Sequence, residues 1–221
     1  MIERIDAETL SGAQSYGLLI DSIVPRPVAW VTSLSSAGVL NLAPFSYFTG
    51  VCNRPPTLLF SIANKRGGLA KDTLNNIRHT AEFVVHIAEE RSAEQLNASS
   101  VDAPPNVGEA GLLGLETRAS DRISVPRLSD PPIAMECRLS RIIDHGDGPG
   151  VSLVFGEILC WQIRDGLRNP DGRIPAHKLS PLSRLGGRDY AGLGAIFSLP
   201  RPKWDPARET PVTLGRSGGK S

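Results

Sequence analysis

Polar residues of types that suit phosphate binding gather at four places in the first third of the chain. They are the pair Thr32-Ser33, the stretches Asn41–Ser46 and Ser61–Asn64, and the triplet Lys71-Asp72-Thr73. Each place lies at the end of a predicted strand or at the start of a predicted helix. A helix N-terminus offers free backbone N–H groups and the positive end of the helix dipole, and Lys71 adds a full charge beside it. Together these residues would hold a phosphate monoester. The alternative is that Asp72 or Thr73 caps a helix and that the hydroxyls fill turn positions.

Glycine-rich stretches elsewhere in the chain fail the requirements of known nucleotide-binding loops. Ser217–Ser221 resembles the end of a phosphate-binding loop, but Leu214 stands where the first glycine of that loop is required. Gly146–Val151 and Gly192–Ala195 lack the third glycine of the dinucleotide fingerprint, and neither stands between a strand and a helix. The sequence therefore predicts no Rossmann fold for a nicotinamide nucleotide.

The histidines and cysteines show no pattern of metal ligands or of a catalytic nucleophile. His79, His145 and His177 are not spaced as ligands, and no Cys-x-x-Cys pair occurs among Cys52, Cys137 and Cys160, which we expect to be small core residues. His86 alternates with Val85 and Ile87, which predicts a half-exposed strand position rather than a metal ligand. No Gly-x-Ser-x-Gly motif occurs. We expect neither a metal site nor a hydrolase.

The composition is that of an ordinary globular protein. Hydrophobic residues make up 40% and charged residues 21%, and 24 Lys+Arg against 23 Asp+Glu leave a formal charge of +1. This balance favours neither nucleic acid nor an anionic membrane as a partner. The first residues lack the apolar region of a secretion signal, and no apolar run is long enough to span a membrane. We expect a cytoplasmic protein.

Strands dominate the elements that must position these polar residues. Apolar, β-branched runs bounded by turn residues predict six strands, over residues 28–33, 39–43, 57–62, 82–87, 134–143 and 151–163. A helix is predicted from Asp72 or Thr73 to about Thr80, a short polar helix over residues 89–97, and a loop with short helical turns over residues 99–126. Strands that follow strands through short turns favour a mainly β fold, a closed antiparallel barrel with helical additions. We expect a single domain over residues 1–205 and a polar tail over residues 206–221.

Four blocks of sequence resemble the flavin reductase-like, FMN-binding split-barrel family. They are Pro25–Ser33, Gly38–Ser46, Lys71–Ile77 followed by Glu82–Val85, and Pro181–Tyr190. They stand in the order and spacing of the family, and the similarity extends from about Tyr16 to Pro200. The family includes the reductase components of two-component monooxygenases and the flavoredoxins. The resemblance implies a six-stranded antiparallel split barrel that forms a homodimer, with FMN (or FAD) bound near the subunit interface.

The resemblance also implies roles for particular residues around the cofactor. Thr32 and Ser33 would lie beside the flavin ring or the ribityl chain, and Asn41, Leu42, Ala43, Pro44 and Ser46 would line the isoalloxazine. Ser61, Ile62 and Ala63 would border the ribityl chain, while Lys71, Asp72 and Thr73 would contact the phosphate. Tyr190 would lie near the ring or on the substrate side. Many relatives carry Asn at the position of His86, which receives no role.

The activity that the resemblance implies is an NAD(P)H-dependent flavin reductase, in which a nicotinamide passes hydride to flavin N5. Such chemistry needs no acid–base side chain, which agrees with the lack of an obvious catalytic group. The protein could serve as the reductase partner of a monooxygenase. An alternative is an FMN-binding electron carrier or redox-sensing protein without NAD(P)H oxidase activity. A third hypothesis is direct conversion of an organic substrate, with the segment Arg164–Arg188 either as a cap that selects it or as an arm at the dimer interface.

Overall fold

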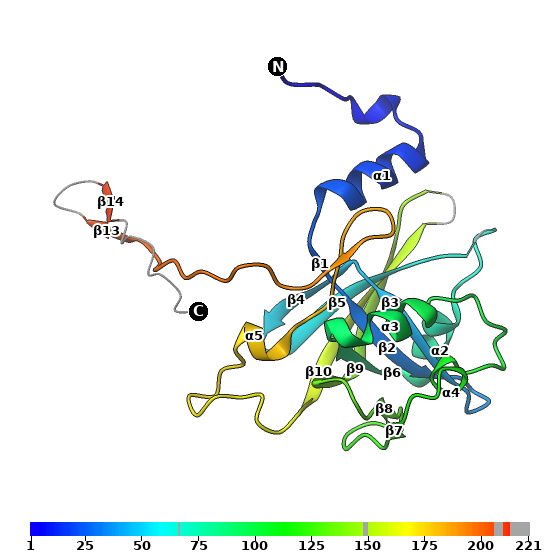
Figure 1. The fold of residues 1–221 in the computed structure, drawn as a ribbon. Coiled ribbons are helices and arrows are strands. Elements are labelled where there is room, and N and C mark those ends of the chain that lie inside the picture. The colour runs from blue at the N-terminus through cyan, green and yellow to red at the C-terminus, as the bar shows by residue number, and fades with distance from the viewer. Residues whose placement is uncertain (66, 148–149, 206–209, 213–221) are drawn as a thin grey trace.

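The fold is described by a computed structural model over residues 1–65, 67–147, 150–205 and 210–212 (Figure 1). The main sheet contains β2 (Ala29–Leu34), β3 (Leu40–Phe45), β4 (Phe48–Asn53), β5 (Pro56–Ala63), β6 (Glu82–Ile87), β9 (Ile133–His145) and β10 (Val151–Ile163). The shorter strands are β1 (Arg26–Pro27), β7 (Thr117–Arg118), β8 (Arg127–Leu128), β11 (Ser183–Arg184), β12 (Tyr190–Ala191), β13 (Lys203–Asp205) and β14 (Thr210–Val212). The helices are η1 (Ala7–Thr9), α1 (Gly12–Ser22), α2 (Asp72–Thr80), η2 (Glu90–Ser92), α3 (Ala93–Ala98), α4 (Glu109–Leu112) and α5 (Ala176–Leu179).

The main sheet closes on itself as a barrel. Its seven strands are all antiparallel and run in the order β3-β2-β6-β9-β10-β5-β4, so β3 and β4 are its two edges. Only Ser46 and Tyr47 separate the end of β3 from the start of β4. That link spans at most about 11 Å, whereas the edges of a flat sheet of this width would lie about 29 Å apart. The sheet must therefore curl until its edges meet at this corner.

The predicted fold class, a mainly β barrel with helical additions, is confirmed, but the number of strands is not. All six predicted strands are present, and β4 is an additional strand at the edge. Its sequence does not alternate, because Gly50 interrupts the apolar residues and the pairing with β5 shifts register between Gly50 and Cys52. Cys52 is also exposed rather than part of the core, since β4 has no partner strand on its outer side.

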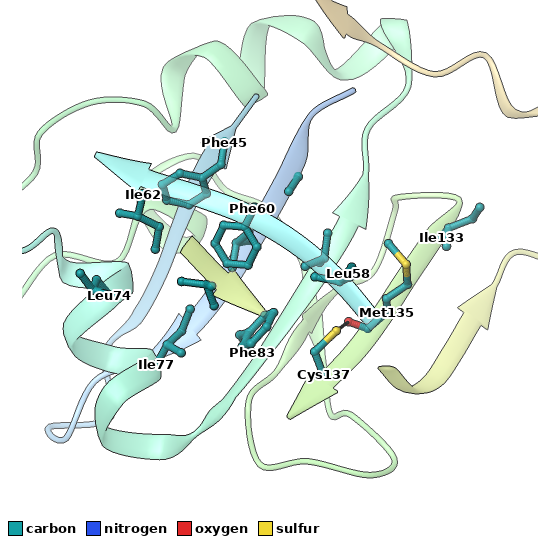
Figure 2. Close-up of a cluster of buried hydrophobic side chains, with 14 of the residues drawn as sticks. Phe45, Leu58, Phe60, Ile62, Leu74, Ile77, Phe83, Ile133, Met135 and Cys137 are labelled. Atoms are coloured by element: carbon teal, nitrogen blue, oxygen red, sulfur yellow. Dashed lines mark hydrogen bonds between the residues drawn. The ribbon is translucent and has the colours of Figure 1, made fainter. Parts of the chain in front are cut away.

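Apolar side chains fill the inside of the barrel (Figure 2). Phe60 lies at the centre, with its ring centroid 5.3 Å from that of Phe45 and 5.5 Å from that of Phe83. Leu74 and Ile77 of α2 are fully buried in the same cluster, as their spacing along one helix face predicts. Helix α2 is therefore fixed against the barrel, and its N-terminus is held beside β3.

A second apolar cluster covers the outer face of β2 and β6. It includes Trp30, Leu42 and Leu96, which come from β2, β3 and α3. Because β6 is covered on both faces, His86 is fully buried, and the predicted half-exposed position is wrong. Its Nδ1 lies 2.8 Å from the carbonyl oxygen of Trp30, and the backbone N–H of Leu128 donates to its Nε2 at 2.9 Å.

Helix α1 and the segment from β12 to β13 extend away from the barrel in Figure 1. Helix α1 has no predicted counterpart, although Ser11 and Gln14 form the reciprocal bonds of a capping box at its start. At the other end, β13 and β14 pair beyond the barrel, and the rest of the predicted tail over residues 206–221 lies outside the described residues. Among the residues that the structure describes, no helix is long and apolar enough to cross a membrane.

Candidate functional site

A cavity of about 480 Å³ opens beside the N-terminus of α2 and the edge strand β3. It brings together six predicted site residues: Asn41, Ala43, Pro44, Lys71, Asp72 and Thr73. The other lining residues come from the loop before α2, the end of α3 with the residues after it, and α4: Lys65, Leu69, Ser99, Ser100, Val101, Asp102, Ala103 and Glu109. Its volume lies within the range of small-molecule sites, about 300–1,000 Å³.

The N-terminus of α2 presents free donors to this cavity. The helix is capped by Lys71, which makes no side-chain capping bond, so neither Asp72 nor Thr73 is the cap. The first backbone N–H groups of a helix have no acceptor within it. Thr73 is buried and accepts a hydrogen bond from Asn41 Nδ2 at 2.9 Å, which joins the helix end to β3. This arrangement can bind an anion through backbone N–H groups and the Thr73 hydroxyl.

Charge in the cavity is divided between a paired and an unpaired lysine. Lys65 Nζ lies 3.0 Å from Asp72 Oδ2 and 3.4 Å from Asp102 Oδ1, and the hydrogen bond to Asp72 raises its pKa. Lys71 forms no ion pair with any described residue. Its charge therefore remains available to an anionic ligand at the helix end.

Glu109 is a residue of this cavity that the sequence did not indicate. Its side chain is buried, and its Oε2 accepts the backbone N–H of Leu42 at 2.8 Å. Burial raises the pKa of this carboxyl group. The approach of α4 to β3 is close, because a Cβ on Gly108 would lie 2.5 Å from the backbone oxygen of Leu40. Nothing in the local Gly-Glu-Ala-Gly pattern predicts this long-range contact.

Several predicted site residues use their side chains inside the protein instead. Thr32 Oγ1 donates to the carbonyl oxygen of Pro126 at 2.8 Å, and Asn76 Nδ2 donates to Ser33 Oγ at 3.1 Å. Leu42 and Ile62 are fully buried apolar side chains. None of these four side chains lines the cavity.

The remaining predicted residues lie on other surfaces of the barrel. Ser61 lines a separate apolar hollow of about 310 Å³, formed mainly by Tyr47, Phe48, Leu59 and Leu153. Ser46 directly precedes Tyr47, which lines this hollow, and Ala63 ends β5 in an exposed position.

Tyr190 lies over the outer apolar cluster. Its hydroxyl donates to Asn97 Oδ1 at 3.2 Å, and the Arg184 guanidinium lies 4.4 Å from its ring centroid. The structure thus separates the predicted set into six residues that line the cavity beside α2 and eight that lie elsewhere.

One group of potential metal ligands has a structural role. Asp121, Glu136 and Cys160 place ligand atoms within 4.8 Å of one another. The carboxylate of Glu136, however, already accepts the backbone N–H groups of Asp121 and Arg122 and the amide of Gln162. These bonds explain how a fully buried carboxylate is accommodated without a metal ion.

Comparison with solved structures defines the class of protein to which this barrel belongs. Nitrilotriacetate monooxygenase component B from Bacillus cereus is 40% identical, with a TM-score of 0.87 over 90% of this chain and 99% of that one. The 2-nitrobenzoate 2-nitroreductase from Pseudomonas fluorescens is 35% identical, with a TM-score of 0.81 over 92% of this chain and 98% of that one. A split barrel domain protein from Shewanella frigidimarina shares the fold at 18% identity, with a TM-score of 0.76 over 88% of this chain and 95% of that one. The class is that of the split-barrel flavoproteins.

The family follows from the sequence itself. The family model of the flavin reductase like domain matches residues 21–177. The chain belongs to the flavin reductase like family, and the resemblance drawn from its motifs is confirmed. It is accordingly a flavin-binding oxidoreductase.

Proposed function

We propose that this protein is an FMN-binding, NAD(P)H-dependent flavin reductase and that the cavity beside α2 holds the cofactor. The observation that carries the proposal is the combination, in one cavity, of a helix N-terminus without a side-chain capping bond, an unpaired lysine and a wall formed by β3. The donors suit the phosphate, and the apolar Ala43 and Pro44 suit a planar ring system. FMN, whose single phosphate ends the molecule, fits this arrangement; FAD is the alternative.

The chain's own residues would hold and orient the nucleotide. The N–H groups at the start of α2 and the Thr73 hydroxyl would donate to the phosphate oxygens, and Lys71 would add charge. Glu109 would act indirectly, because it holds the backbone of Leu42 at the edge of β3 and so fixes the strand that carries Ala43 and Pro44. Thr32 and Ser33 would support the site from behind through Pro126 and Asn76.

Bound flavin supplies the redox chemistry, by accepting hydride from a reduced nicotinamide nucleotide and passing electrons on. The role of the protein is to position the two ring systems and to exclude water from between them. No described side chain has to transfer a proton for this step. We propose NAD(P)H as the reductant, bound in the open part of the groove over the flavin.

We propose two recipients for the electrons. The 40% identity to a monooxygenase component B favours a separate monooxygenase that uses the reduced flavin. The 35% identity to a nitroreductase favours direct reduction of an organic acceptor, for which the apolar hollow around Tyr47 and Leu153 offers a surface. Turnover with free flavin but without an organic acceptor would support the first.

A titration with FMN and riboflavin tests where the phosphate binds. Riboflavin lacks the phosphate, so loss of the lysine charge in Lys71→Met should weaken FMN binding by about tenfold and leave riboflavin binding unchanged. The matched control is Arg78→Met, at the opposite end of the same helix, which should change neither affinity. Equal weakening of both ligands, or of neither, in Lys71→Met would contradict the assignment. FAD titrated in parallel distinguishes the two nucleotides.

We also propose that the protein is a homodimer. Large apolar side chains are exposed on both extended segments, among them Tyr16 and Leu19 on α1, Leu199 before β13 and Trp204 in β13. A monomer rarely exposes so much apolar surface without a partner. A second copy of this chain would cover these side chains.

A further inference from the structure

A second polar cavity lies on another side of the barrel, where the β7–β8 ribbon covers the start of β9 and the end of β10. Figure 1 shows this ribbon below β6, β9 and β10. The cavity measures about 300 Å³ and shares no lining residue with the cavity beside α2. The ribbon side contributes Arg118, Arg127 and Ser129, and the sheet contributes Ala134, Gln162 and Ile163.

Two arginines stand directly opposite each other in the ribbon. Arg118 and Arg127 are partners in the antiparallel register of β7 and β8, so their side chains leave the ribbon on the same face. Ser129 follows the end of β8 and lines the same cavity as the two arginines. Like charges placed directly opposite repel each other. The pair therefore gains stability from any anion that lies between or above the two guanidinium groups.

Two buried polar atoms of this wall have no partner. Arg127 Nε and Ser129 Oγ are buried, and no described atom forms a hydrogen bond with either. A buried donor that has lost its water without gaining a partner costs about 1–3 kcal/mol. Such groups are uncommon in native proteins and call for an explanation, such as a bound ion or water. Both belong to the same cavity wall.

Two charged side chains of the lining, Asp130 and Arg164, are paired with groups outside the cavity, whereas Asp165 is not. Asp130 pairs with Arg91, and Arg164 pairs with Glu89, so this part of the lining is neutral. Asp165, on the rim, forms no ion pair with the described residues.

Two further carboxylates lie behind Gln162 and do not reach the arginines. Gln162 Nε2 donates to Asp121 Oδ2 at 2.6 Å and to Glu136 Oε1 at 2.9 Å. Within the described part of the chain, no carboxylate oxygen lies within 4.0 Å of Arg118 or Arg127. Neither guanidinium group therefore has a counter-ion at ion-pair distance, although Asp165 lies on the rim of the same cavity.

We propose that this cavity binds a small oxyanion, a carboxylate or phosphate group of a metabolite-sized molecule. A planar guanidinium suits two oxygens of such a group, and the Ser129 hydroxyl would donate to it as well. Ala134 and Ile163 leave room for a small apolar part of the ligand. This cavity is separate from the proposed flavin cavity, so the protein would bind a second ligand there, against β9 and β10.

Calorimetric titration of the FMN-saturated protein tests the proposal, because the flavin phosphate then occupies the cavity beside α2. The probes are inorganic phosphate and sodium acetate at constant ionic strength, and they distinguish a phosphate ligand from a carboxylate. We expect millimolar or tighter binding of at least one probe, and a loss of about tenfold or more in affinity for Arg118→Met and for Arg127→Met. Arg122→Met, an exposed arginine outside the cavity, is the matched control and should bind as the unaltered protein does.

The outcome is decisive even if one variant is unstable. Arg118 is exposed, so Arg118→Met should fold even if loss of the half-buried Arg127 side chain destabilises the protein. Failure of both probes to bind, or unchanged binding in Arg118→Met, would overturn the proposal. FMN affinity should be the same in all these variants. A protein that binds no FMN would defeat the flavin assignment, while the dependence of phosphate or acetate binding on Arg118 would still test this site.

Discussion

Two buried ionisable side chains, His86 and Glu109, organise the backbone around the barrel. His86 contacts the backbone oxygen of Trp30 and accepts the N–H of Leu128, so it joins β2, β6 and β8. Glu109 accepts the N–H of Leu42, whose strand is an edge of the sheet and has no neighbouring strand on that side. Each side chain thus satisfies backbone groups that would otherwise be buried without a partner.

The first prediction concerns the response of His86 to acid. Burial lowers the pKa of His86 to about 4, from the ordinary value of 6.5. The unfolded chain therefore takes up a proton before the folded protein does. Stability is complete above pH 6.5 and falls as the pH decreases toward 4, by up to about 3 kcal/mol from this group. Urea unfolding of the unaltered protein and of His86→Gln at several pH values measures the effect. A histidine variant with the same acid slope as the unaltered protein would contradict it.

The second prediction separates the hydrogen bond of Glu109 from its charge. Glu109→Leu leaves the buried N–H of Leu42 without an acceptor and should lower the free energy of unfolding by about 1–3 kcal/mol. Glu109→Gln keeps an oxygen acceptor and should lose much less. Urea unfolding of the two variants tests this order. Equal losses would show that the carboxylate charge, rather than the bond to Leu42, is what matters.

At the scale of elements, local sequence signals predict the strands whose apolar residues follow a regular pattern. The six predicted strands and helix α2 are present, because apolar runs and turn residues marked them. The sequence does not predict strand β4, since an exposed edge strand with a glycine and a register shift lacks a periodic apolar pattern. The sequence does not predict the burial of His86, because the residues that cover this face of the sheet, Leu96 and Leu128, are distant from it in the chain.

The candidate site was predictable only in part for the same reason. The residues at the start of α2 and in β3 carry local signals, and the cavity unites them. Glu109, Lys65 and the residues after α3 reach it through long-range contacts that leave no local pattern.

The third prediction concerns the packing of the long hairpin formed by β9 and β10. A Cβ on Gly156 would lie 2.4 Å from Phe83 Cζ, in the middle of the barrel core. Gly156→Ala should therefore cost about 1–3 kcal/mol, because the ring must shift. Gly50→Ala is the control, since no atom lies within 4 Å of the corresponding Cβ, and its change should stay within about 0.5 kcal/mol. Thermal unfolding of the two variants gives the comparison, and equal stability would show that the core yields freely around Phe83.

At the scale of the whole molecule, the barrel buries its own apolar core, whereas the two extended segments leave large apolar side chains exposed. The core residues of the barrel are buried within one chain, but α1 and the segment toward β13 expose large apolar side chains. In Figure 1 both segments lie away from the barrel. This contrast is the reason for proposing a homodimer, in which a second copy of the chain would cover both segments.

The fourth prediction is that these arms hold a dimer together. Light scattering after size-exclusion chromatography should give twice the chain mass of 23.7 kDa at micromolar protein. Leu19→Asp and Leu199→Asp should shift the protein toward the monomer, because each places a charge in the proposed apolar contact. Leu112→Asp, on α4, replaces a comparably exposed leucine away from both arms and should leave the mass unchanged. A monomer in the unaltered protein would contradict the homodimer.

The central claim, that a flavin bound by this chain is reduced by a nicotinamide nucleotide, is tested most directly by visible spectroscopy. The protein, saturated with FMN and separated from excess, is mixed anaerobically with NADH or NADPH, and absorbance near 450 nm is followed. We predict a yellow protein whose flavin band bleaches with at least one of the two nucleotides. A flavin that dithionite reduces but neither nucleotide does would contradict the reductase and favour an electron carrier. A protein that remains colourless after incubation with FMN would contradict the flavin site itself.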